Sequence, residues 1–331
     1  MIRKQKFATK TVFSILFAGA LVTSMQSRGQ VNTHPQIAAT GAEGFTTSLI
    51  VKNEAFRLYG EKNSSLRREV GEIENAARTF TDRFGAFGTL DIVVVENPMS
   101  LFLIDHSQYQ PHFLPLLSYA ALASANSDED VFGNKDKNIL SHEVCHKFMI
   151  LLMEQKGLQN KTYAKPRYGH TELPDWFDEI AAISCESEAM KKKRLSDFYA
   201  KGNADSLLPI AEFLSVEHPS LKVMEKQLSQ LVAKAKANVN ASGFAMEVME
   251  INEEKSEEFI TEYYVQALLF DRFIEASLGE GAVKELVELL AQQRSVEAWL
   301  VNKLALDSIE DVDSAFKKFV SETYAIHKNS V

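Results

Sequence analysis

Residues 138–149, Asn-Ile-Leu-Ser-His-Glu-Val-Cys-His-Lys-Phe-Met, are the most informative stretch of the 331-residue chain. They open an amphipathic segment, residues 138–155, which predicts a helix. On a helix His142 and His146 lie one turn apart on the same face, so both imidazoles can bind one zinc ion at about 2.0–2.1 Å. Glu143 is rotated by about 100° from His142 and so flanks the metal, where a general base for an activated water belongs.

A third protein ligand is expected, because a catalytic zinc usually has three ligands and one open position. The segment Glu172-Leu-Pro-Asp-Trp-Phe-Asp-Glu-Ile-Ala-Ala182 offers several carboxylates. Pro174 stands at a favourable first-turn position and predicts a second helix that runs to about Lys192. The residue types leave five candidates for the third ligand: His170, Glu172, Asp175, Asp178 and Glu179.

The two segments together resemble a known pattern. HEVCH, followed 33 residues after His146 by the Glu179 of LPDWFDEIAA, is similar to HExxH…LPxWxxEGxA of the gluzincins. These are the thermolysin- and aminopeptidase-related zinc metallopeptidases, and the nearest resemblance is to bacterial peptidase MA-like domains. Segments 206–214 and 264–279 also resemble those domains, so the likeness spans about residues 45–325. It implies zinc bound by His142, His146 and Glu179, with peptide or protein substrates.

Two positions depart from this pattern. Ile180 stands where a glycine usually follows the ligand glutamate, and Ile183 stands where some members have a supporting aspartate. Because of these departures, the chain could instead be a binding module that retains the fold but has no enzymatic activity. The same metal chemistry also allows an amidase that acts on a non-peptide amide. Glu186, on the helical face of Glu179, is either a support for a ligand histidine or a solvated side chain.

A hydrogen-bond donor for the developing oxyanion is expected besides the metal. Tyr264 is the candidate because of its position in the helix that resembles the family, and Tyr263, Tyr168 and His170 are the alternatives. If neither tyrosine is catalytic, one ring of the Tyr263–Tyr264 pair is expected in the core and the other at the surface. The other histidines lack metal-type spacing and are expected to be ordinary surface or loop residues: His34, His106, His112, His218 and His327.

The order of the predicted elements indicates an α+β fold, zincin-like, with the active site between a small N-terminal mixed sheet and a mostly helical C-terminal part. We expect strands within 45–59, at 90–95 and at 117–125, with a helix at 64–84. The 117–125 strand is either core or an edge that pairs with substrate. Further helices are expected near residues 207–215, 219–238, 256–278, 281–293 and 308–325. The predicted subdomains are 45–157, with the HExxH helix, and 158–331.

The N-terminus predicts export. A basic head precedes an apolar run from Thr11 to about Met25, which indicates a signal peptide over residues 1–27, or an uncleaved anchor, before a linker at 28–44. No later stretch reaches membrane-spanning length, so we expect a soluble periplasmic or secreted protein. The formal charge of −9 argues against a nucleic-acid partner.

Two smaller features complete the predictions. Cys145 and Cys185 are the only cysteines, and in an exported chain they either form a disulfide or remain two buried thiols. The basic run at residues 191–194 is expected to be a solvated helix face. The oligomeric state is not predicted.

Overall fold

The computed structural model describes residues 46–61, 66–97, 100, 103–110, 112–118, 139–158, 173–201, 206–219, 221 and 254–328. The predicted signal peptide and linker, and nearly all of the predicted helix at 219–238, lie outside these residues. So do three of the alternative site residues, Tyr168, His170 and Glu172.

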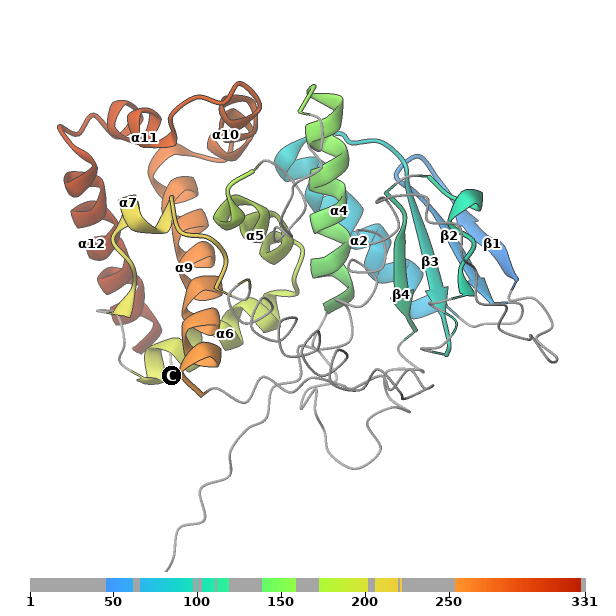
Figure 1. The fold of residues 1–331 in the computed structure, drawn as a ribbon. Helices are drawn as coiled ribbons and strands as arrows, with labels where there is room; N and C mark the ends of the chain where they lie inside the picture. The colour runs from blue at the N-terminus through green and yellow to red at the C-terminus, as the bar shows by residue number, and fades with distance from the viewer. Residues whose placement is uncertain are drawn as a thin grey trace, which may run out of the picture.

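A four-stranded mixed sheet forms the N-terminal part (Figure 1). Its strands are β1 (Thr47–Lys52), β2 (Phe56–Glu61), β3 (Leu90–Val95) and β4 (Leu114–Leu117), in that spatial order. β1 is antiparallel to β2, whereas β2, β3 and β4 are parallel. The strands predicted within 45–59 and at 90–95 are confirmed. Of the strand predicted at 117–125 only Leu117 is in β4, and residues 119–125 lie outside the described part of the chain.

Both faces of the sheet are covered by apolar side chains, which explains why five of the six residues of β3 are apolar. One face joins the main hydrophobic core with helices α2 (Arg67–Phe84) and α4 (Ile139–Gln155). The other face packs against a small cluster that includes Ile104 and Phe113. Asp91, the one charged residue of β3, is buried and accepts two hydrogen bonds from Arg57, at 2.5 and 2.8 Å. A buried charge is tolerated in this sheet because it is paired.

The chain after α4 is mainly helical, which confirms the α+β prediction. Its helices in the described residues are α5 (Asp175–Ser184), α6 (Glu188–Lys201), α7 (Ile210–Phe213), α9 (Glu254–Leu278), α10 (Ala282–Ala291), α11 (Val296–Leu304) and α12 (Ile309–Lys328). The main hydrophobic core continues through them to α12. The division into two subdomains at residue 157 stays a prediction.

Two details of the helices differ from the prediction. The helix predicted from Pro174 to Lys192 is two helices, because α5 ends at Ser184 and α6 begins after Ser187, whose Oγ accepts from the Met190 N–H at 3.2 Å. A serine that caps the next helix competes with continuation of the previous one. Helix α11 was not predicted, although Ser295 caps it by accepting from the Ala298 N–H.

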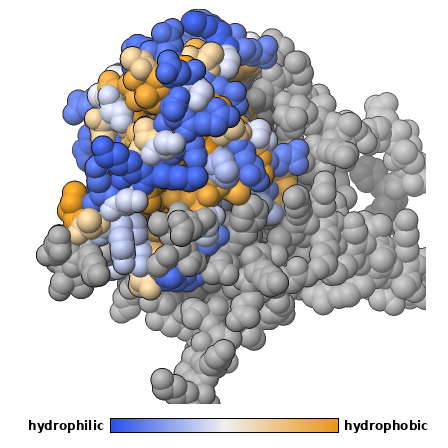
Figure 2. All heavy atoms as spheres, turned by 90° about the vertical axis from the view of Figure 1, so that its left-hand side faces the viewer, coloured by the Kyte–Doolittle hydropathy of each residue, from blue (hydrophilic) through white to orange (hydrophobic). Residues whose placement is uncertain are grey.

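The outer face of the helical part carries hydrophobic side chains interspersed with hydrophilic ones (Figure 2). Within the described ranges, no helix combines the length and the apolar character needed to cross a bilayer.

Candidate metal centre

Helix α4 presents His142 and His146 together, as the spacing predicts. Both side chains are nearly buried, and their Nε2 atoms lie 3.2 Å apart. The two rings are close to perpendicular, with centroids 4.8 Å apart. Two imidazole nitrogens that face each other at this distance are arranged to bind one shared metal ion.

Helix α5 packs against α4 and brings Glu179 to the two histidines. The Glu179 side chain is fully buried; its Oε2 lies 3.6 Å from His142 Nε2, and its Oε1 lies 3.7 Å from His146 Nε2. One donor atom from each of these three residues lies within 4.8 Å of the others. The structure therefore brings together the three predicted ligands as a buried group that could hold a metal ion.

The distances between these donor atoms are of the size found around a bound metal. Ligand distances of about 2.0–2.2 Å, typical of zinc, place two ligand atoms of a tetrahedron roughly 3.3–3.6 Å apart. The two histidine Nε2 atoms are 3.2 Å apart, and each lies 3.6 or 3.7 Å from a different carboxylate oxygen of Glu179. The three side chains could therefore hold one metal ion between them.

Glu186 supports His142 from the far side of its ring. The His142 Nδ1–H donates to Glu186 Oε1 at 3.0 Å, which leaves Nε2 directed toward the other metal donors. Arg194 donates to both Glu186 oxygens, at 2.7 and 2.9 Å. Burial favours the neutral acid, but Arg194 and His142 outweigh it and lower the pKa of Glu186 to about 2. The prediction of a solvated run at residues 191–194 is therefore wrong for Arg194.

Asp178 supports His146 in a similar position. Its Oδ2 lies 3.1 Å from His146 Nδ1, on the ring edge opposite the metal donors. Burial alone would lower the pKa of His146, yet the carboxylates of Asp178, Glu179 and Glu143 raise it to about 10. So much negative charge around a buried imidazole favours a cation at this centre. Asp178, one of the alternative third ligands, supports a ligand instead.

His218 is a residue of this centre that sequence reasoning missed. It was expected to be an ordinary surface or loop residue; it does stand in the loop after α7, but it is fully buried there, and its Nε2 lies 3.6 Å from Glu179 Oε1. Its backbone N–H donates to Asp175 Oδ2 at 2.6 Å, so Asp175, another alternative ligand, positions this loop. Burial lowers the pKa of His218 well below its usual value, with His146 and His142 adding to the effect. No spacing in the sequence connects His218 with the other site residues.

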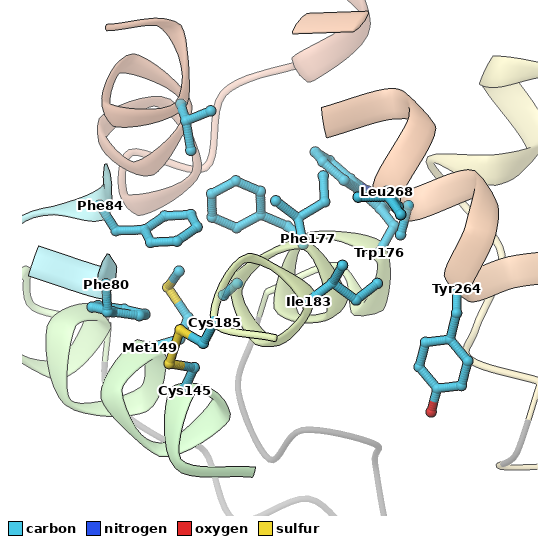
Figure 3. Packing of buried hydrophobic residues seen from close by; sticks show 14 of the residues in the cluster. Phe80, Phe84, Cys145, Met149, Trp176, Phe177, Ile183, Cys185, Tyr264 and Leu268 are labelled. Carbon is cyan, nitrogen blue, oxygen red and sulfur yellow. A yellow bond between two sulfur atoms is a disulfide. The ribbon is translucent and has the colours of Figure 1, made fainter. Parts of the chain in front are cut away.

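Both tyrosines of α9 lie at the centre and both are buried, so neither is the exposed member of a pair. The Tyr264 ring centroid lies 5.9 Å from that of His142 and 5.4 Å from that of His218. Arg194 lies over the Tyr264 ring at 5.1 Å. Tyr263 packs edge-on against His218 at 4.9 Å, and burial raises the pKa of its hydroxyl. Figure 3 shows Tyr264 projecting from α9 at the margin of the hydrophobic cluster, with its hydroxyl directed away from the other labelled side chains.

Glu143 follows His142 on α4 and is half-buried. Its charge contributes to the raised pKa of His146, which shows that the carboxylate is electrostatically coupled to the donor set. Glu143 is not a member of the donor cluster, and its role as a general base stays a prediction.

A disulfide joins Cys145 and Cys185, so the prediction that left both states open resolves to the oxidised one. Disulfides persist in oxidising compartments, so this bond points to an extracytoplasmic location. Comparison of the chain with protein-family models, with curated proteins and with solved structures found no match.

Proposed function

We propose that this chain is an exported zinc-dependent peptidase whose metal is held by His142, His146 and Glu179. The observation that carries the proposal is the buried cluster of these three donors, close enough to share one metal ion, on two packed helices. Two imidazoles and one glutamate form a ligand set of catalytic zinc in peptidases. The raised pKa of His146 supports a positive charge at the same place.

When bound, zinc would polarise the scissile carbonyl and make water a stronger nucleophile near neutral pH. Glu143 takes a proton from the attacking water and passes it to the leaving amine. Glu186 and Asp178 hold the two imidazoles with Nε2 directed to the metal. The protein's part is thus to fix the ligands and to move one proton at Glu143.

Two groups are placed to donate a hydrogen bond to the developing oxyanion. Tyr264, the residue selected from the sequence, has its ring next to both His142 and His218. His218 is the second candidate, since a neutral buried imidazole carries one N–H and its ring lies beside Glu179. We assign the role to Tyr264 and keep His218 as the alternative.

The edge of the sheet next to α4 suggests how a peptide binds. Among the residues that the structure describes, β4 is the last strand in the sheet order, and it lies on the side nearest α4 (Figure 1). An extended peptide can add its main chain to such an edge, which gives affinity with little side-chain selectivity. We therefore propose β4 as the strand that aligns the substrate with the metal helix.

Metal content tests the centre directly. Elemental analysis of purified wild-type protein should find about one zinc per chain, and Glu179→Ala should lose most of it because one of three ligands is gone. A wild-type protein that binds no divalent metal would refute the site.

Activity is tested separately with a library of quenched fluorescent peptides. Wild-type protein should show turnover that a chelator abolishes, and Glu143→Gln should keep zinc while losing roughly 10²–10⁴-fold in rate. Metal binding without turnover on any peptide would instead favour a binding module, or an amidase for a non-peptide substrate, the alternatives that Ile180 and Ile183 keep open.

A further inference from the structure

The disulfide lies between the two helices that supply the metal donors. Cys145 belongs to α4 and directly precedes His146, while Cys185 caps the end of α5 and directly precedes Glu186. Figure 3 shows the S–S bond bridging these helices beside the aromatic cluster. Both cysteines are buried, and both sulfur atoms approach the Ala76 carbonyl of α2.

The bond joins the two helices at the level of the metal centre. All three donors come from α4 and α5, and the carboxylate that orients His142 follows Cys185 in the chain. The bond fixes the Cα atoms of Cys145 and Cys185 at 6.5 Å. Any sliding or separation of α5 relative to α4 would move Glu179 and Glu186 away from His142 and His146 together.

The backbone around Cys185 is not part of a helix, so the disulfide is more important for the position of Glu186. Helix α5 has ended at Ser184, and α6 begins only at Glu188. Glu186 therefore lies in a short turn between the helices, in which its backbone N–H donates to the Ile183 carbonyl at 3.0 Å, while the orientation of its side chain depends on tertiary contacts. Its two partners, His142 and Arg194, and the neighbouring disulfide are what position it.

We propose that the Cys145–Cys185 disulfide is a positioning element of the metal centre, so that its reduction weakens metal binding while the fold persists. The proposal rests on the metal site proposed above. It differs from a purely stabilising disulfide, which would change the unfolding temperature but leave the affinity of the folded protein for metal unchanged.

Reduction is done with a trialkylphosphine, because thiol reductants themselves bind zinc. The phosphine attacks one sulfur and the S–S bond breaks; water then supplies the oxygen of the phosphine oxide and the two protons that leave both cysteines as thiols. Because both sulfur atoms are buried, the reaction needs local opening of the structure and a long incubation. Free thiols, counted after denaturation, confirm completion, and the phosphine is removed without air.

The measurement is the affinity of full-length, metal-free protein for Zn²⁺, by competition with a chromophoric chelator, and for Co²⁺ by its visible spectrum. We expect the reduced protein and the variant Cys145→Ala/Cys185→Ala to bind each metal about 10- to 100-fold more weakly than the oxidised protein, the range found when support for a ligand is lost. Phosphine should not change the affinity of the double variant.

A matched control separates positioning from general destabilisation. Phe316 is fully buried in α12 and packs against Phe270 and Phe273 of α9, so Phe316→Leu lowers the unfolding temperature through a change in a helix that supplies no metal donor. Its metal affinity should equal that of wild type. Circular dichroism establishes that each form is folded, and if the double variant does not fold, the reduced wild-type protein carries the test.

The outcomes are distinct. Equal affinity of the oxidised and reduced proteins, within about twofold, overturns the positioning role and leaves the metal site standing. Failure of the oxidised protein to bind either metal overturns the site and this proposal with it. An equal loss of affinity in Phe316→Leu assigns the effect to stability and also overturns the proposal.

Discussion

Replacing Glu186 by glutamine should change how the stability of the metal-free protein depends on pH. Arg194 and His142 lower the pKa of this buried carboxylate from 4.5 to about 2. At about 1.4 kcal/mol per pKa unit, the shift corresponds to roughly 3 kcal/mol of folding free energy. The charged carboxylate thus stabilises the folded state more than the unfolded one.

The sign follows from the lowered pKa. The contribution is fully present above the unfolded-state pKa of 4.5 and is lost as the pH falls toward 2, so that about 1 kcal/mol remains at pH 3. The free energy of unfolding, measured by urea titration in the presence of a chelator, should therefore fall more steeply between pH 6 and pH 3 in wild type than in Glu186→Gln. The difference between the two proteins should shrink by about 2 kcal/mol over that interval.

Glu72→Gln serves as the matched control, because Glu72 pairs with Arg68 on the surface at 3.0 Å. Exposed pairs of this kind contribute about 0–1 kcal/mol, so its pH curve should run close to that of wild type. Parallel curves for wild type and Glu186→Gln between pH 6 and pH 3 would refute the reasoning, because Glu186 would then titrate alike in the folded and unfolded chains.

Three further predictions concern the metal centre. Asp178→Asn should weaken zinc binding by about 10- to 100-fold in chelator competition, since it removes the charge beside His146 Nδ1; unchanged affinity would contradict a supporting role. Tyr264→Phe should keep its metal and lower kcat by roughly 10²–10³ if Tyr264 is the oxyanion donor; if His218→Ala alone has that effect in steady-state kinetics, the assignment is reversed. Zinc binding at pH 7 should release about one proton, because the metal-free centre raises the pKa of His146 to about 10 and a bound imidazole must lose that proton; calorimetry in buffers of different ionisation enthalpy counts it.

Local sequence was enough to predict two of the three candidate metal donors. His142 and His146 belong to one helix, so their relative position follows from four residues of spacing and from little else. Glu179 required more, because its place depends on how α5 packs against α4, and the resemblance of LPDWFDEIAA to a known pattern supplied that step. The strand at 90–95 was predictable for a similar reason, since six consecutive buried residues leave a clear local signal.

The rest of the centre depends on tertiary structure that no local pattern contains. His218 stands in a loop after α7, and its burial between α5 and α9 follows from the packing of helices distant in sequence. The disulfide likewise joins positions 40 residues apart. Glu186 was considered because of helical spacing from Glu179, yet α5 ends before it. Glu186 does contact His142, as one of the two alternatives proposed, but it does so from the turn after α5 and not from the helical face of Glu179.

The contact between Glu186 and His142 bears on whether Ile180 and Ile183, which differ from the gluzincin-like pattern, count against the proposed activity. Both side chains are buried in the main core, so neither can support a ligand. His142 Nδ1 nevertheless has a carboxylate partner, Glu186, which Arg194 holds in its charged form. The absence of an aspartate at position 183 therefore does not leave His142 without a supporting carboxylate, and a test for an inactive site must address the metal, Glu143 or the oxyanion donors instead.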